Sequence, residues 1–153
     1  MDSRNYAPPM MQVLFAAKLE VEPFECQIGT EHWLVALLAK DETLAQALEE
    51  AGVTKEALRR AYKARYRLNG MPRRNTGGPR YTPGLTKVFA RAEAVAVELL
   101  HPGHVHSADV LAALFESDDS MMLHLLDEVL AVDREALLAR VHKAVADSLA
   151  AVS

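Results

Sequence analysis

The chain has 153 residues, a length that suits one domain or two very small ones. It contains 25 alanines and 21 leucines but only 6% aromatic residues, a composition that predicts a mostly helical protein. Its single cysteine, Cys26, excludes an internal disulfide framework and favours a reducing, cytoplasmic setting, and no apolar run is long enough for a membrane span.

Four helices are expected in the first half of the chain. The first follows Pro8 and Pro9, and its inward face repeats at helical spacing: Met10, Val13, Leu14, Ala17 and Val21. The second is expected to be capped by Thr30 and to turn Trp33, Leu34, Leu37 and Leu38 inward. A third helix runs from about Thr43 to Ala51 and stops at Gly52, and Thr54 caps a fourth that continues to about Arg67.

Four more helices are expected in the second half. Thr82 caps the first of these, with Pro83 at the first helical position. The expected starts of the other three are Ser107, Asp119 or Ser120, and Asp133. The sequence therefore predicts eight helices and no strands.

The two halves are similar to each other. Tyr6-Ala7-Pro8 recurs 75 residues later as Tyr81-Thr82-Pro83, segment 28–37 recurs at an offset of 77, and the last helix of each half matches at 79. The offset grows only between expected helices, where loops accept insertions. These offsets predict two copies of one unit, with repeat one at 6–66, a linker at 67–80 and repeat two at 81–150.

The stretch 63–80 carries six basic residues and no acidic one, whereas the rest of the chain holds 11 basic and 21 acidic residues. The net charge of −4 therefore combines an acidic body with a basic, Gly/Pro-rich connector that continues the tail of a helix. Nucleic-acid binding is the alternative interpretation, since Lys and Arg neutralise phosphates, but the acidic remainder and the few aromatic residues argue against it.

Segment 28–38 reads Ile-Gly-Thr-Glu-His-Trp-Leu-Val-Ala-Leu-Leu, and Ala-Leu-Glu-Glu-Ala-Gly-Val follows at 47–53. Together with the duplication, which extends from Tyr6 to about Val145, this pattern resembles the Clp amino-terminal repeat. That repeat occurs twice in the N-terminal domain of ClpA- and ClpC-class AAA+ unfoldases. The resemblance implies an all-α fold, in which two tandem four-helix repeats form a single pseudo-twofold eight-helix bundle over residues 1–153.

The resemblance also implies a domain that is not an enzyme and that delivers adaptors or protein substrates to an unfoldase ring and, through it, to a ClpP peptidase. The sequence has no Gly-rich loop that ends in Gly-Lys-Ser/Thr, so neither nucleotide hydrolysis nor a cofactor is expected. A free-standing Clp repeat protein that sequesters adaptors or modulates the Clp machine is the alternative.

The expected adaptor- or substrate-binding surface runs from the start of the first helix of each copy to the start of its second helix. It includes Thr30 and Glu31 in one copy and Thr82 and Lys87 in the other. The second copy has Val-His-Ser-Ala at 105–108 in place of Ile-Gly-Thr-Glu, which is more similar to the ClpA branch. That branch docks the adaptor ClpS.

In the ClpC branch, the Glu of each Gly-Thr-Glu-His segment and a Thr at a helix start form a pocket for phosphorylated arginine. A carboxylate can bind a guanidinium bidentately, and a helix N-terminus can bind a phosphate. In this chain the pocket of the first copy keeps Glu31 but has Ala7 where the Thr would be. Thr82 likewise lacks its Glu because Ala108 takes that position, so both pockets are expected to be incomplete.

Three histidines, His101, His104 and His106, crowd one loop and are a candidate zinc site. They lack the Cys or carboxylate ligands at fixed spacing that such sites use, so no metal is expected. Met121 and Met122 are expected in a helix that covers the core, with an adaptable peptide-binding surface as the alternative.

Overall fold

The structure is a computed structural model and describes residues 5–70, 72, 74, 75, 77, 80–98 and 104–151. Within these ranges it contains eight α-helices, one short 3-10 helix and no strand, so the predicted all-α class is confirmed. The elements are α1 (Met10–Val21), η2 (Glu22–Phe24), α2 (Thr30–Lys40), α3 (Glu42–Glu49), α4 (Lys55–Asn69), α5 (Pro83–Glu98), α6 (Ser107–Glu116), α7 (Ser120–Val129) and α8 (Arg134–Ala151).

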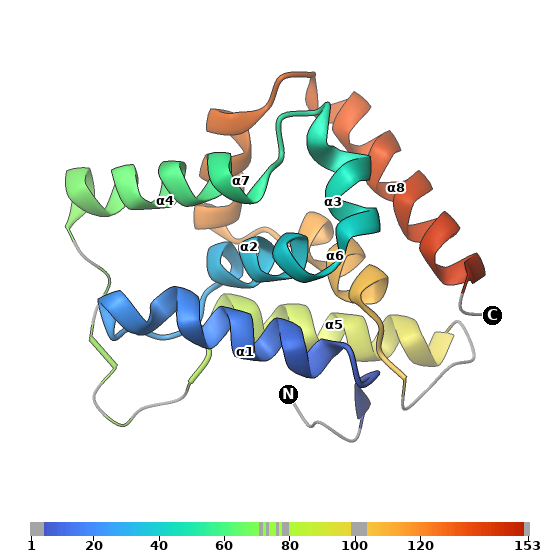
Figure 1. Cartoon of the computed structure of the whole chain (residues 1–153), viewed down its shortest axis with the longest axis horizontal. Helices are drawn as coiled ribbons and strands as arrows, with labels where there is room; N and C mark the ends of the chain where they lie inside the picture. Colours follow the sequence, from blue (N-terminus) through green and yellow to red (C-terminus); the bar gives the residue numbers. More distant parts are fainter. Residues whose placement is uncertain are drawn as a thin grey trace.

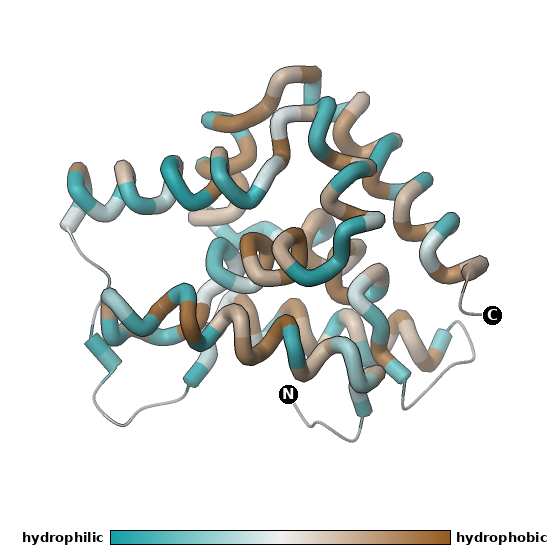
Figure 2. The backbone as a smooth tube through the Cα atoms, viewed as in Figure 1, coloured by the Kyte–Doolittle hydropathy of each residue, from teal (hydrophilic) through white to brown (hydrophobic). Residues whose placement is uncertain are grey.

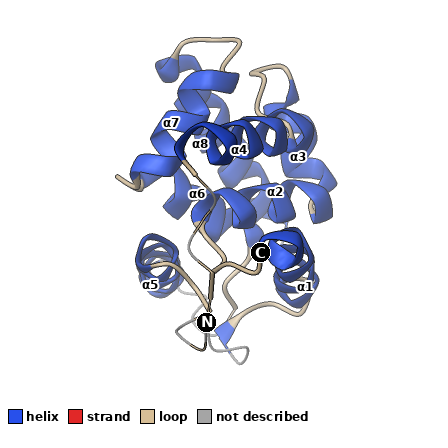
Figure 3. Cartoon of the chain, turned by 90° about the vertical axis from the view of Figure 1, so that its left-hand side faces the viewer, coloured by secondary structure: helices blue, strands red, loops and turns tan. Residues whose placement is uncertain are grey.

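The helices form three tiers (Figure 1). Helices α1 and α5 lie lowest, α2 and α6 lie in the middle, and α3, α4, α7 and α8 cover the top. The middle tier contains long hydrophobic stretches (Figure 2), in keeping with its position between the other two. The turned view shows α1 and α5 on opposite sides below it (Figure 3).

The upper tier interlocks the two halves of the chain. Helix α3 packs against α8, and its counterpart α7 packs against α4, so each third helix contacts the fourth helix of the other copy. The inner helices follow the same symmetry, since α2 packs against α1 and α4 while α6 packs against α5 and α8. The predicted two-repeat, pseudo-twofold bundle is thus confirmed, with its copies interleaved.

Two equivalent pairs of backbone hydrogen bonds, which we call the crossed backbone connections, join the copies and obey the same symmetry. The amide N–H of Thr82 donates to the carbonyl of Ile28 over an N···O distance of 3.0 Å, and Ile28 N–H donates to Arg80 at 2.8 Å. At the equivalent positions, Ala7 N–H donates to Val105 and Val105 N–H donates to Asn5, both at 2.9 Å. The segment before the first helix of each copy therefore pairs with the segment before the second helix of the other.

Most predicted helix starts are confirmed. The side chains of Thr54, Thr82, Asp119 and Asp133 each accept a hydrogen bond from a backbone N–H three residues later. This accounts for the starts of α4, α5, α7 and α8, because a cap satisfies amides that have no partner within the helix. Helix α4 ends at Asn69, two residues beyond the predicted end.

Two predicted caps are wrong. Gly29 and His106 hold the N-cap positions of α2 and α6, so Thr30 and Ser107 are the first helical residues. Their hydroxyls bind the other copy instead: Thr30 Oγ1 donates to Asp119 Oδ1 at 2.9 Å, and Ser107 Oγ donates to Met10 Sδ at 3.3 Å. The sequence pattern thus locates the first turn of each helix correctly, but each hydroxyl bonds to the other copy instead of to a backbone amide of its own helix.

The core is continuous between the copies. Trp33 is fully buried, as predicted, and its ring meets the edge of Phe89 with the centroids 4.8 Å apart. Phe89 also makes edge contacts with Tyr6 and Tyr81, so aromatic residues of both copies share one cluster. No helix among the described residues is long and apolar enough to cross a membrane.

Gly52, in the turn before α4, provides a test of the interlock. Its φ is +87°, and a Cβ there would lie 2.3 Å from the carbonyl oxygen of Val129 in the other copy. We expect Gly52→Ala to lower the free energy of unfolding by more than the strain of about 1–3 kcal/mol that a positive φ imposes on alanine. Chemical denaturation measures this loss.

Gly70→Ala is the matched control, because Gly70 has a φ of +91° and a Cβ added there would have no atom within 4 Å. This variant should lose the conformational strain alone. An equal loss in both variants would mean that the contact between Gly52 and Val129 adds nothing to stability.

Candidate functional site

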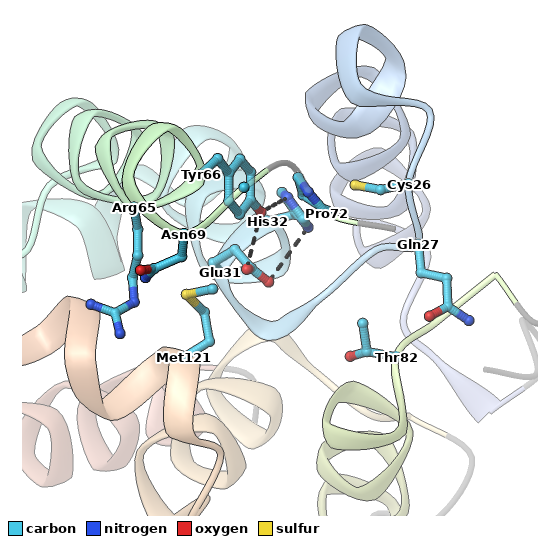
Figure 4. A pocket seen from close by; sticks show the side chains of 11 residues that line it. Cys26, Gln27, Glu31, His32, Arg65, Tyr66, Asn69, Pro72, Thr82 and Met121 are labelled. Atoms are coloured by element: carbon cyan, nitrogen blue, oxygen red, sulfur yellow. Dashed lines mark hydrogen bonds and ion pairs between the residues drawn. The ribbon is translucent and has the colours of Figure 1, made fainter. Parts of the chain in front are cut away.

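A pocket of about 220 Å³ opens where the N-terminus of α2 meets the end of α4 and the starts of α5 and α7 (Figure 4). Glu31 and His32 come from α2, Arg65 and Tyr66 from α4, Thr82 precedes α5, and Met121 comes from α7. Its wall is completed by Cys26, Gln27, Asn69, Gly70 and Pro72. Both copies therefore contribute to one pocket.

Tyr66, His32 and Glu31 form a directed chain of hydrogen bonds at the base of this pocket (Figure 4). The N–H of Gly29 donates to His32 Nδ1 at 2.9 Å, so the proton of a neutral imidazole lies on Nε2. His32 Nε2 is 2.8 Å from the hydroxyl oxygen of Tyr66, and that hydroxyl donates to Glu31 Oε2 at 3.1 Å. His32 is thus a buried residue that packs in the core and caps the start of α2.

Glu31 is a buried carboxyl whose described hydrogen-bond partners are neutral. Only 7% of the residue is exposed, and burial raises its pKa to about 7, with Asp119 adding to the effect and the Tyr66 hydroxyl opposing it. Burial lowers the pKa of His32 to about 4, so the 3.6 Å approach of its Nδ1 to Glu31 Oε1 is not an ion pair at neutral pH. The carboxylate therefore has no compensating cation among the described residues that it contacts.

The conformation of Glu31 depends on Gly29. A Cβ at position 29 would lie 1.9 Å from Glu31 Oε1 and 3.5 Å from Thr82 Cγ2. The φ of Gly29 is −101°, which any residue can adopt, so glycine is needed here for space. The carboxylate and the threonine of the other copy close over the same glycine.

The four predicted binding residues do not all meet. Glu31 and Thr82 line the pocket, whereas Thr30 is buried beside them and its hydroxyl is bonded to Asp119. Lys87 is exposed on α5 and borders a different hollow, with Arg91 and Glu116. The predicted surface is therefore divided into two places.

Pairing the phosphoarginine residues within each copy is wrong. The crossed backbone connections bring Thr82 next to the start of α2, where Glu31 lies, and place Ala7 beside Val105 at the start of α6. The pocket therefore holds the retained Glu and the retained Thr together. Ala7 and Ala108 fall together on the other side of the pseudo-twofold axis.

The helix N-terminus beside this pocket already faces an anion. A Cβ at Gly84, in the first turn of α5, would lie 2.2 Å from Asp119 Oδ2. Asp119 Oδ1 accepts hydrogen bonds from Thr30 Oγ1 and from Met122 N–H. One carboxylate is therefore hydrogen-bonded at the starts of α2 and α7 and lies against the first turn of α5, at the place where a phosphate would have to bind.

Several pocket residues were not predicted from the sequence. Tyr66 lies one helical turn after Tyr62 on α4, and both are buried. This spacing of two tyrosines on a strongly charged helix was the available signal. For Met121 and Met122 the sequence allows either a core position or a binding surface. Met121 lines the pocket, whereas Met122 is buried in the core.

The remaining candidates do not extend the site. His101 lies outside the described residues, and among those that are described no three His, Cys, Asp or Glu side chains are grouped to hold a metal ion. Cys26 is buried, and burial together with Glu31 raises the pKa of its thiol to about 11. In the basic stretch, Arg65 pairs with Glu128 at 3.5 Å and Arg74 pairs with Glu25.

Comparison with known proteins gives one family and one fold. The family model of the Clp repeat N-terminal domain matches residues 16–129. The N-terminal domain of ClpD, a caseinolytic-protease-associated chaperone from Arabidopsis thaliana, is 15% identical, with a TM-score of 0.68 and coverage of 94% of this chain and 96% of that one. A search of curated proteins gave no match.

Two further solved structures are similar. The N-terminal domain of Hsp104 from Candida albicans is 13% identical, with a TM-score of 0.66 over 90% of this chain and 89% of that one. A structure from investigations of a malarial protein secretion system is 21% identical, with a TM-score of 0.65 over 95% and 98%. At these identities the likeness concerns the fold.

The pKa values of the pocket predict a specific pH dependence. The pKa of Glu31 is about 7 in the folded state and 4.5 in the unfolded chain. Its contribution to the free energy of unfolding therefore falls as pH rises from 4.5 to 7. His32 acts in the opposite direction, because its folded pKa of about 4 lies below 6.5 and its contribution falls as pH drops through that range.

Since the two effects offset each other in the native protein, the variant Glu31→Gln isolates the first. Relative to the native chain, this variant should gain about 3 kcal/mol of stability between pH 4.5 and pH 8, measured by urea denaturation. Glu49→Gln, at the exposed end of α3, is the control and should show no such drift. A pH-independent difference for Glu31→Gln would contradict the raised pKa.

Proposed function

Because the chain belongs to the family of Clp repeat N-terminal domains, we propose that it recognises adaptors or substrates for a Clp-type AAA+ unfoldase and its ClpP-like peptidase. Members of this family bind adaptors and substrates of unfoldases. The proposed role is recognition without catalysis, in the cytoplasm, and needs no cofactor. A ClpS-like protein is one candidate adaptor.

The observation that carries the proposal is the buried Glu31 carboxylate at the base of a pocket open to solvent. A cationic side chain of a partner would give this carboxylate the charge partner that the described chain does not provide. Hydrogen bonds to charged groups contribute about 1.5–3 kcal/mol when they form away from bulk water. Met121 and the ring of Tyr66 offer apolar surface for the aliphatic stem of such a side chain.

Two contacts favour an unmodified basic side chain over phosphorylated arginine. The Thr82 hydroxyl oxygen already accepts from Leu85 N–H at 3.2 Å, and the Asp119 carboxylate occupies the space next to Gly84. A phosphate would approach this second carboxylate and be repelled by it. We therefore propose a guanidinium or ammonium group of a protein partner as the ligand.

A catalytic role is not part of the proposal. His32 is neutral and uses both ring nitrogens in the hydrogen bonds described above, and the thiol of Cys26 has a strongly raised pKa. A reactive cysteine has the opposite environment, in which a nearby positive charge favours the thiolate. His32 contacts the Tyr66 hydroxyl that donates to Glu31, and neither His32 nor Cys26 lies in an environment that prepares a nucleophile.

Recognition of this kind does not require high affinity. A domain joined to an unfoldase ring by a short flexible linker would hold its partner at an effective concentration on the order of millimolar near the pore. A free-standing Clp repeat protein would have the reverse effect, because it would keep the same partners away from the ring. Both versions of the proposal use the same pocket.

Capture combined with protein turnover tests the proposal. The tagged chain, Glu31→Gln and the control Glu49→Gln are used as baits in lysate of the source cells, and half-lives of the captured proteins are measured with and without the gene. We expect Glu31→Gln to reduce capture by about 10- to 100-fold, and the control to retain it. Capture by the native chain should also increase from pH 6 to pH 8, because the carboxylate form binds a cation.

The half-lives separate the two versions of the role. Captured proteins that live longer when the gene is deleted support delivery to the protease, and shorter half-lives support sequestration. Unchanged half-lives for every protein whose capture needs Glu31 would reject both.

A further inference from the structure

Helix α1 has apolar side chains on two faces. Its inner face, with Met10, Val13 and Ala17, is buried in the core. On its outer face Met11, Phe15 and Leu19 follow one another at steps of four residues and are 40%, 62% and 52% exposed. Hydrophobic colour accordingly recurs along the whole tube of α1 in Figure 2. A helix that is apolar on both faces is ordinarily covered on both.

The fold does not need these exposed side chains. The pseudo-equivalent positions on the outer face of α5 are Thr86, Ala90 and Ala94, which are also exposed. Helix α5 thus packs in the same tier with small or polar residues where α1 has large apolar ones. We call Met11, Phe15 and Leu19 the α1 stripe.

A hollow of about 430 Å³ adjoins the α1 stripe, so the surface there is concave rather than flat. Phe15 and Leu19 form one side of the hollow, and Ile28 lies at its base. Lys18 and Arg80 border it, against the single carboxylate of Glu22. Among the described residues no ion-pair partner reaches either cation, so the rim is positive although the chain as a whole is acidic.

We propose that the α1 stripe docks an amphipathic helix of a partner protein, whose apolar face lies on Met11, Phe15 and Leu19 and whose flanking carboxylates face Lys18 and Arg80. Helix-in-groove binding of this type uses apolar anchors at helical spacing and takes its orientation from the charges at the rim. The proposal goes beyond the Glu31 pocket and stands whether or not that pocket binds a partner.

The charges favour such a partner over a second copy of the chain. A symmetric dimer through the α1 stripe would bring the Lys18 side chains of two copies toward each other, along with their Arg80 side chains. Like charges at an interface oppose association. An acidic amphipathic helix instead places opposite charges on this rim.

The test uses two fluorescein-labelled helical peptides of about 16 residues, long enough to be partly helical alone. Both carry the same leucine stripe, but one has glutamates on its flanks and the other has lysines. By fluorescence anisotropy the glutamate peptide should bind at least about fivefold more tightly than the lysine peptide. Phe15→Ser should weaken its binding by about tenfold.

Val97→Ser is the matched control, because Val97 is 58% exposed on α5, away from the stripe. It should leave binding unchanged, and thermal melting by circular dichroism checks that each variant is folded. The double variant Lys18→Glu with Arg80→Glu should reverse the preference, so that the lysine peptide binds better.

Four peptide-binding results would each overturn the proposal. These are no binding of the glutamate peptide, equal binding of both peptides, an affinity that Phe15→Ser does not change, and a preference that the charge reversal does not alter. Sedimentation that shows a dimer of the native chain, lost in Phe15→Ser, would assign the stripe to a second copy and equally overturn it.

Discussion

The crossed backbone hydrogen bonds between the two copies are the constraint on which the other features depend. Ile28 is held against Thr82, and Ala7 is held against Val105. Each bond joins a segment before a first helix to one before a second helix of the other copy, so each copy supplies backbone partners to the other. Buried backbone amides need hydrogen-bond partners. These contacts therefore fix the positions of the segments from which α1, α2, α5 and α6 begin.

The same scaffold supports different side chains in the two halves. Glu31, His32 and Tyr66 correspond by the repeat offsets to Ala108, Asp109 and Val145. Asp109 repeats the role of His32, since its carboxylate accepts the N–H of His106 at 2.9 Å. Without a carboxylate at position 108 or a hydroxyl at 145, the second half lacks the hydrogen-bonded chain of the first. Only the first copy therefore supplies this chain of hydrogen bonds, although side chains of both copies line the pocket of the proposed recognition site.

Burial explains the electrostatics of this site. Glu31 lies at a helix N-terminus, which favours its charge, yet its removal from water dominates and raises its pKa. Asp119 has hydrogen-bond donors of its own, because it accepts from a threonine hydroxyl and from a backbone amide of the helix that it caps. The two carboxylates therefore differ: Asp119 is hydrogen-bonded at the starts of α2 and α7, whereas Glu31 is the carboxylate to which the proposed ligand would bind.

The sequence alone determined the helical class, the duplication, most helix starts and the buried apolar faces of α1 and α2, because these follow from periodicity, capping and internal similarity. It also indicated Glu31 and Thr82 separately. Only the tertiary structure decided that the two lie in one pocket, with Tyr66 below and Asp119 beside it. The reason is that copies related by sequence interleave in space, so residues that are neighbours in one repeat unit face residues of the other. The sequence shows which residues each copy has. The way in which the two copies interleave determines which of these residues come into contact.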